Sequence, residues 1–166
     1  MSAYTPKREE MERFMSRAIE LSVEGASKGH GGPYRAVVVK DGEIVGEGYN
    51  RVFVDSDPSA HGEVVAIRNA GKNLGMFEIT GCSLYTNFEP CPMCAATIWW
   101  SKLDRVFYAQ PVKGSTVHHE ENQEEVFNFV ATPIDKRSIP GEQIESKAKE
   151  ALDIIEKYLT DHTKKV

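Results

Sequence analysis

The chain has 166 residues, of which 40% are hydrophobic and 27% are charged, and its formal net charge is −5. These values predict one globular domain, and the acidic balance argues against a nucleic-acid partner because phosphate-binding domains carry clustered Lys and Arg. No apolar run approaches the roughly 20 residues that span a bilayer. The lack of such a run predicts no membrane partner. Three cysteines, two of them in a Cys-x-x-Cys spacing, favour a reduced, cytoplasmic protein.

The first half of the chain predicts a helix, a hairpin and a second helix. Apolar residues recur at three- and four-residue steps over residues 7–28, which is typical of an amphipathic helix. The runs 35–40 and 44–50 flank Asp41-Gly42 and predict a hairpin, whose first strand is apolar without alternation and so should be covered on both faces. Residues 60–74 predict a helix that ends at Gly75.

The second half continues the alternation of strands and helices. Residues 82–87 and 105–109 predict strands, and a helix between them begins near Pro90 and Pro92. Residues 120–130 and 143–160 predict two further amphipathic helices. The pattern indicates an α/β fold with parallel crossovers. No repeat or linker divides the chain, so we expect a single domain over residues 1–166.

Two short stretches carry the residue types of a metal site: His61-Gly62-Glu63 and Pro90-Cys91-Pro92-Met93-Cys94. Cys91 and Cys94 are three residues apart at a helix start, so their side chains share one face, and the helix dipole favours the thiolate form. Two thiolates and the His61 imidazole suit Zn²⁺ and leave one coordination position open for water.

Glu63 decides between a catalytic and a structural zinc site. At the first turn of its helix it can reach past the helix end, hold the water and move its proton. A solvated Glu at a helix N-terminus is the alternative. A closed zinc site completed by Cys82, His118 or His119 is a second alternative, but Cys82 belongs to a separate strand and the spacing of the two histidines does not predict a ligand. A redox Cys-x-x-Cys pair is a third, and it leaves His61 and Glu63 unexplained.

At these residues the chain resembles the cytidine deaminase-like superfamily, whose H-x-E and P-C-x-x-C motifs it contains. Further stretches are similar to the bacterial guanine deaminases: Gly31-Gly32-Pro33-Tyr34, Asp57-Pro58-Ser59-Ala60-His61, Glu89 to Cys94, and Ser138-Ile139-Pro140. The resemblance covers roughly residues 10–140. It implies a three-layer α/β/α sandwich around a mixed sheet of about five strands, with residues 10–140 as the catalytic core.

The resemblance also implies the roles of the site residues. His61, Cys91 and Cys94 would bind Zn²⁺ and Glu63 would shuttle protons. The Asn50 amide and the backbone N–H of Gly62 would hydrogen-bond the substrate ring. Family members are commonly dimers, so residues 141–166 are expected to form a C-terminal helix and tail that contact a partner subunit in a homodimer.

The chain departs from the guanine deaminases at three places. Tyr34-Arg35 replaces a Phe-Gly pair before the first central strand, and both residues are expected at the substrate pocket. Arg35 could bind an anionic or carbonyl group there or point to solvent. Asn122 stands where the family has a substrate-reading aspartate. The chain also lacks the family's terminal aromatic lid, for which Tyr158 or His162 could substitute.

The expected function is hydrolytic deamination of a small amino-substituted ring, with the free base guanine as first choice. Cytosine, isocytosine, ammeline or a nucleoside fit the same chemistry, and a tRNA adenosine deaminase shares the core but fits the acidic charge poorly. A non-catalytic, zinc-stabilised interaction domain is the alternative from a different class.

Overall fold

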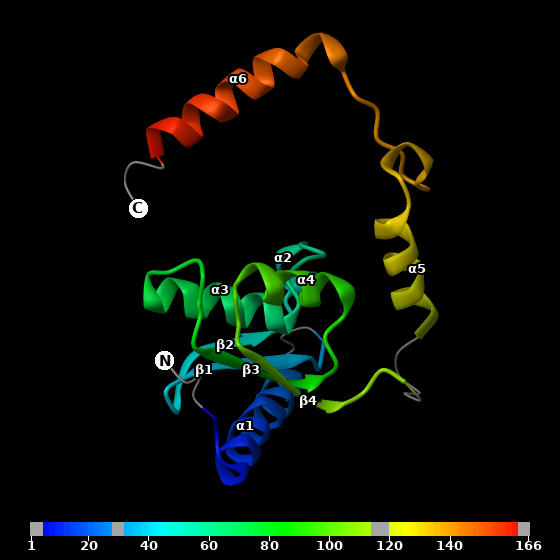
Figure 1. The fold of residues 1–166 in the computed structure, drawn as a ribbon. Coiled ribbons are helices and arrows are strands. Elements are labelled where there is room, and N and C mark those ends of the chain that lie inside the picture. The colour runs from blue at the N-terminus through cyan, green and yellow to red at the C-terminus, as the bar shows by residue number, and fades with distance from the viewer. Residues whose placement is uncertain (1–4, 28–31, 114–119, 163–166) are drawn as a thin grey trace. The chain divides into compact units, whose positions relative to one another are not determined.

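The computed structural model describes residues 5–27, 32–113 and 120–162. Its contacts divide the chain into two compact units, Met1–Glu124 and Glu125–Val166. The first unit contains a four-stranded sheet with helices on both faces (Figure 1). The boundary at residue 124 precedes the limit near residue 140 expected for the core, and the single domain expected over residues 1–166 stays a prediction.

The sheet has the strand order β2-β1-β3-β4, formed by β1 (Arg35–Lys40), β2 (Glu43–Tyr49), β3 (Cys82–Phe88) and β4 (Arg105–Gln110). β1 pairs antiparallel with both β2 and β3, and β3 pairs parallel with β4, so the sheet is mixed. The β1–β2 hairpin turns at Asp41-Gly42, where both residues have positive φ, as the sequence predicts.

Two apolar clusters cover the two faces of the sheet. On one face, α1 (Arg8–Ser27) packs through Phe14 against Val37 and Tyr85. On the other face, α3 (Gly62–Leu74) packs through Ala66 and Ala70, and α4 (Pro92–Trp100) lies on the same side (Figure 1). The residues of β1 are therefore buried on both faces, and the three-layer α/β/α sandwich is confirmed.

The described residues form four strands, one fewer than the about five expected. All four strands arise from the four β-branched or aromatic runs read in the sequence. Within residues 5–27, 32–113 and 120–162, no other segment is extended and paired. β2 and β3 are both antiparallel to β1 and so run in the same direction, and β3 is parallel to β4. The connections through α3 and α4 therefore both join parallel strands, as the alternation of strands and helices predicts.

The remaining helices include α2 (Val52–Asp55), a single turn between β2 and α3. α5 (Glu120–Ala131) runs across the boundary of the two units, and the second unit continues with η1 (Ile134–Lys136) and α6 (Glu145–His162). In α6, Leu152, Ile155 and Leu159 are each more than half exposed. Within the described residues, no helix is long and apolar enough to cross a membrane.

Candidate active site

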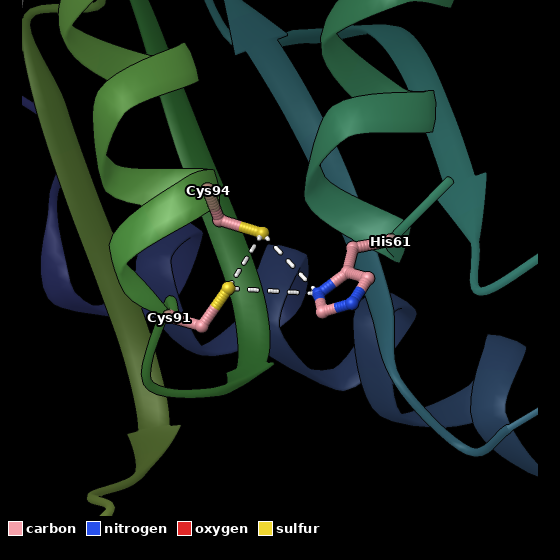
Figure 2. Close-up of side chains that lie close together, drawn as sticks. All are labelled: His61, Cys91 and Cys94. Atoms are coloured by element: carbon pink, nitrogen blue, oxygen red, sulfur yellow. Dashed lines mark hydrogen bonds between the residues drawn. The ribbon is translucent and has the colours of Figure 1, made fainter. Parts of the chain in front are cut away.

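Two helix starts meet at the carboxyl end of β3. His61 is the N-cap of α3 and Cys91 is the N-cap of α4; both have extended backbone angles before the helix begins. Pro92 occupies the first turn of α4. Backbone N–H groups there have no acceptor within the helix, so the N–H that proline lacks costs no helical hydrogen bond. Figure 2 shows the side chains of Cys91 and Cys94 pointing from α4 toward the ring of His61.

The three candidate ligands are arranged as a tetrahedral zinc ion requires. The Cys91 Sγ–Cys94 Sγ, Cys91 Sγ–His61 Nδ1 and Cys94 Sγ–His61 Nδ1 distances are all 3.6 Å. Zn–S bonds of about 2.3 Å and Zn–N bonds of about 2.1 Å at tetrahedral angles place such ligand atoms about 3.6–3.8 Å apart. The donor set therefore fits zinc by both chemistry and geometry. Among the described residues these three form the metal-binding cluster, and no fourth ligand joins them.

The alternative of a closed four-ligand site finds no support in the described residues. Cys82 is fully buried at the start of β3 and is not part of the cluster. His118 and His119 lie outside the described residues. The arrangement leaves room for one exchangeable ligand, which is the pattern of a catalytic rather than a structural zinc site.

The ligand cluster ionises at Cys91. A hydrogen bond with Cys94, followed by one with His61, lowers the pKa of the Cys91 thiol to about 4. The same thiol pair and burial raise the pKa of Cys94, and the bond with Cys91 raises the pKa of His61. A thiolate at Cys91 beside an imidazole is the form in which a cysteine binds metal.

Glu63 lies in the first turn of α3 and is 5% exposed. Burial raises the pKa of its carboxyl group, since the charged form loses solvation. Glu63 borders the same cavity as His61 and Cys91. The solvated Glu considered as an alternative is therefore excluded.

The cavity has a volume of about 280 Å³. It is bordered by the candidate site residues Tyr34, Asn50, His61, Glu63 and Cys91, together with Gly32, Val52, Phe53, Phe88, Glu89 and Gln123. Ligand pockets typically have volumes of about 300–1,000 Å³. A cavity just below this range suits a single small ring system.

Asn50 is held in one orientation at the end of β2. Its backbone N–H donates to the Tyr34 carbonyl at 3.0 Å, and its Oδ1 accepts a hydrogen bond from the Val52 N–H at 3.2 Å. Its Nδ2 donates no hydrogen bond to a described residue. Asn50 also borders the cavity, so its Nδ2 group is available there as a hydrogen-bond donor.

Gly62 lets α3 approach the backbone before β1. A Cβ at this position would lie 2.7 Å from the Tyr34 carbonyl oxygen and 3.1 Å from the Arg35 Cα, closer than side chains pack. The close approach brings the first turn of α3 against residues 34 and 35. Backbone N–H groups of a first helical turn have no partner within the helix, so the N–H of Gly62 suits a ligand acceptor.

Arg35 is neither in the cavity nor in solvent. Its side chain is buried, with the residue 1% exposed, and its guanidinium donates to the carbonyls of Leu21 (3.0 Å), Gly32 (2.6 Å) and Tyr34 (3.0 Å). Burial lowers its pKa. Arg35 therefore serves the fold, in contrast to both positions expected from the sequence.

The remaining expected substrate contacts have different outcomes. Tyr34 borders the cavity and packs edge-on against Phe88, with ring centroids 5.8 Å apart. The side chains of Asn122 and His162 lie outside the described residues. Tyr158 is 60% exposed on α6 in the second unit.

Sequence reasoning did not select six residues that border the cavity: Gly32, Val52, Phe53, Phe88, Glu89 and Gln123. Glu89 accepts a hydrogen bond from the Val112 N–H at 2.9 Å and so ties the segment after β4 to the site. Its place beside Pro90-Cys91 was a usable signal. Phe53, an aromatic residue in a mostly polar loop, was another; the position of Gln123 has no local signal.

Comparison with known proteins agrees with this geometry. Residues 8–110 match the model of the cytidine and deoxycytidylate deaminase zinc-binding region. The chain belongs to this deaminase family. Membership identifies it as a zinc-dependent enzyme that hydrolyses C–N bonds, and it accounts for the donor set of His61, Cys91 and Cys94.

Two kinds of relative stand out within the family. The chain is 45% identical to the guanine deaminase of Bacillus subtilis over 139 residues, covering 80% of this chain and 85% of that protein. The crystal structure of that guanine deaminase superposes with a TM-score of 0.80 at 39% identity, over 90% of this chain and 93% of the other. A tRNA-specific adenosine deaminase of Haemophilus influenzae is 38% identical over 109 residues, 65% of this chain and 62% of that protein.

Proposed function

We propose that the chain is a zinc-dependent guanine deaminase that converts the free base to xanthine and ammonia. The observation that carries the reaction is the presence of Glu63 in the same cavity as the metal cluster. The likeness to the Bacillus subtilis guanine deaminase over 85% of that protein supports the substrate.

Each residue has a defined task in this reaction. His61, Cys91 and Cys94 would hold Zn²⁺, which when bound makes a water molecule acidic enough to attack at neutral pH. Glu63 takes a proton as water adds to the amino-bearing carbon and passes it to the adjacent ring nitrogen. It then transfers the second water proton to the amino group, so the C–N bond breaks and ammonia leaves.

The ring is held by groups that the fold has already oriented. Asn50 offers its Nδ2 hydrogens to a ring acceptor, because its Oδ1 is occupied by the Val52 N–H. The Gly62 N–H offers a second donor at the start of α3. Tyr34 and Phe88 provide an aromatic wall for a flat ring.

The cavity favours a neutral base over a phosphorylated nucleotide. Apart from His61 in the metal cluster, its described lining contains no basic side chain, whereas Glu63 and Glu89 supply acidic groups. A phosphate group would need Arg or Lys partners or a cluster of free N–H donors. Together with the net charge of −5, the acidic lining also disfavours a tRNA substrate.

A substrate panel tests the proposal. Zinc-loaded protein is assayed for ammonia release from guanine, guanosine, cytosine, isocytosine, ammeline and an adenosine-containing tRNA anticodon stem. Guanine should give the highest kcat/KM. A higher value for any other substrate would replace guanine as the substrate, and no release from any of them would favour the zinc-stabilised interaction domain.

A second experiment tests the assignment of Glu63. Glu63→Gln should bind zinc in the wild-type ratio while kcat falls about 10²–10⁴-fold, the usual contribution of a general acid–base group. Zinc content is measured by atomic absorption and kcat by ammonia release. Near-normal turnover in this variant would remove Glu63 from the mechanism.

We also propose that the chain acts as a cytoplasmic homodimer in which residues 1–166 form one deaminase domain per subunit. The exposed apolar residues Leu152, Ile155 and Leu159 on α6 support a contact between this helix and a partner subunit. Sedimentation velocity of the wild type and of Leu152→Glu tests the dimer. A monomeric wild type would contradict it.

A further inference from the structure

Phe53 is the most exposed aromatic residue on the border of the cavity. The residue borders the cavity and is 84% exposed. It makes no ring contact with any described residue. A phenyl ring in this position leaves apolar surface in water that a ligand in the cavity can cover.

The turn that carries Phe53 is held by polar contacts and contains no buried residue. The Arg51 N–H donates to the Ala60 carbonyl at 2.8 Å, and the Arg51 guanidinium makes two hydrogen bonds of 2.6 Å with the Asp55 carboxylate. The Val52 N–H is bonded to Asn50. The local fold thus fixes the position of Phe53 without using its ring.

From this arrangement we infer that Phe53 is a substrate-binding residue whose ring stacks on the flat heterocycle to be deaminated. This inference rests on the proposed function and adds a specificity-determining contact to it. Phe53 directly follows Val52, whose N–H orients the Asn50 amide. One short turn therefore sets both the hydrogen bond to the edge of the ring and the contact with its face.

Stacking explains why the position carries an aromatic side chain. Every nucleobase has a π-face, so stacking adds affinity for planar rings and selects against non-planar or saturated ones. Covering one face of a phenyl ring corresponds to about a tenfold change in the binding constant. The contact acts on ground state and transition state alike, so it should change KM and leave kcat nearly constant.

Steady-state kinetics with guanine test the inference. Phe53→Ala should raise KM about tenfold with kcat within about threefold of wild type. Phe53→Tyr, which retains the ring, should restore KM to within twofold. Phe77→Ala is the matched control, because Phe77 is 87% exposed but does not border the cavity; its KM should equal that of wild type.

Each contrary result has a distinct meaning. Equal KM values for wild type and Phe53→Ala would overturn the inference on Phe53. Turnover of guanine by the wild type would in that case still support the proposed function. A Phe53→Ala protein that dissociates in sedimentation velocity and recovers its KM at high protein concentration would assign Phe53 to a subunit contact instead. If wild type deaminates another ring of the panel, the variants are compared on that ring. If it deaminates none, the proposed function and this inference both fail.

Discussion

Gly48→Ala tests the tight packing of β2 against α3. A Cβ at Gly48 would lie 2.2 Å from both the Ala66 backbone nitrogen and the Gly62 carbonyl oxygen. An ordinary contact begins at 3.4 Å, so the strand or the helix must move by about 1.2 Å, and overpacking of this kind costs about 1–3 kcal/mol. The atoms in the way are backbone atoms, which cannot turn aside as a side chain can.

The same displacement should reach the chemistry, because the first turn of α3 contains Gly62 and Glu63 and is capped by His61. Misplacement of catalytic groups by about 1 Å lowers activity about 10²-fold. We therefore expect Gly48→Ala to lower both the unfolding free energy, measured with urea, and kcat/KM for guanine.

Gly46→Ala separates the two effects. A Cβ at Gly46 would lie 2.5 Å from the Ala66 carbonyl oxygen and 2.6 Å from the Ala70 nitrogen, further along α3 from its first turn. It should lose a similar amount of stability and less activity than Gly48→Ala. If Gly48→Ala had the urea midpoint and the kcat/KM of wild type, close packing against α3 could not be the reason why residue 48 is a glycine.

Two further predictions concern residues outside the catalytic cluster. Arg35→Met should lower the unfolding free energy by about 3 kcal/mol because three carbonyls lose a charged donor, while the folded protein still binds zinc. An unchanged urea midpoint would contradict the structural role of Arg35. The hydrogen bond from the Ser59 hydroxyl is the main reason why the pKa of Asp57 lies below its ordinary value of 3.8. The Asp57 carboxylate therefore stabilises the folded protein fully above the ordinary pKa, and this stabilisation is lost as the pH falls through the lower pKa of the folded state. Asp57→Asn should therefore have a lower Tm than wild type at pH 6 but a smaller drop in Tm from pH 6 to pH 3, and parallel Tm curves would contradict this.

The metal cluster was predictable because its geometry is local. Cys91 and Cys94 are brought together by one helical turn, and His61 needs only a second helix start at the same sheet edge. The hairpin at Asp41-Gly42 was equally local, since its positive φ angles favour this residue pair.

The role of Arg35 was not predictable, because its partners are distant in sequence or formed by backbone. One acceptor is the Leu21 carbonyl on α1, 14 residues away. Because the acceptor is a backbone group, the type of residue at position 21 does not indicate it. An arginine before an apolar strand therefore reads as exposed or ligand-binding. The cavity position of Phe53 depends in the same way on how α2 folds back after β2.

The contacts of Arg35 also show how scaffold and substrate recognition are connected. The Tyr34 carbonyl accepts hydrogen bonds from the Arg35 guanidinium and from the Asn50 N–H, both at 3.0 Å, and α3 packs against it through Gly62. One buried cation thus fixes the backbone that sets the position of Asn50 and the start of α3. Arg35, at which the sequence differs from the guanine deaminases, therefore supports the site through the Tyr34 backbone and does not border the cavity. Under the proposed function, ring selection then falls to residues that border the cavity, with Asn50 at the ring edge and Phe53 on its face, while the zinc ligands and Glu63 would determine the reaction.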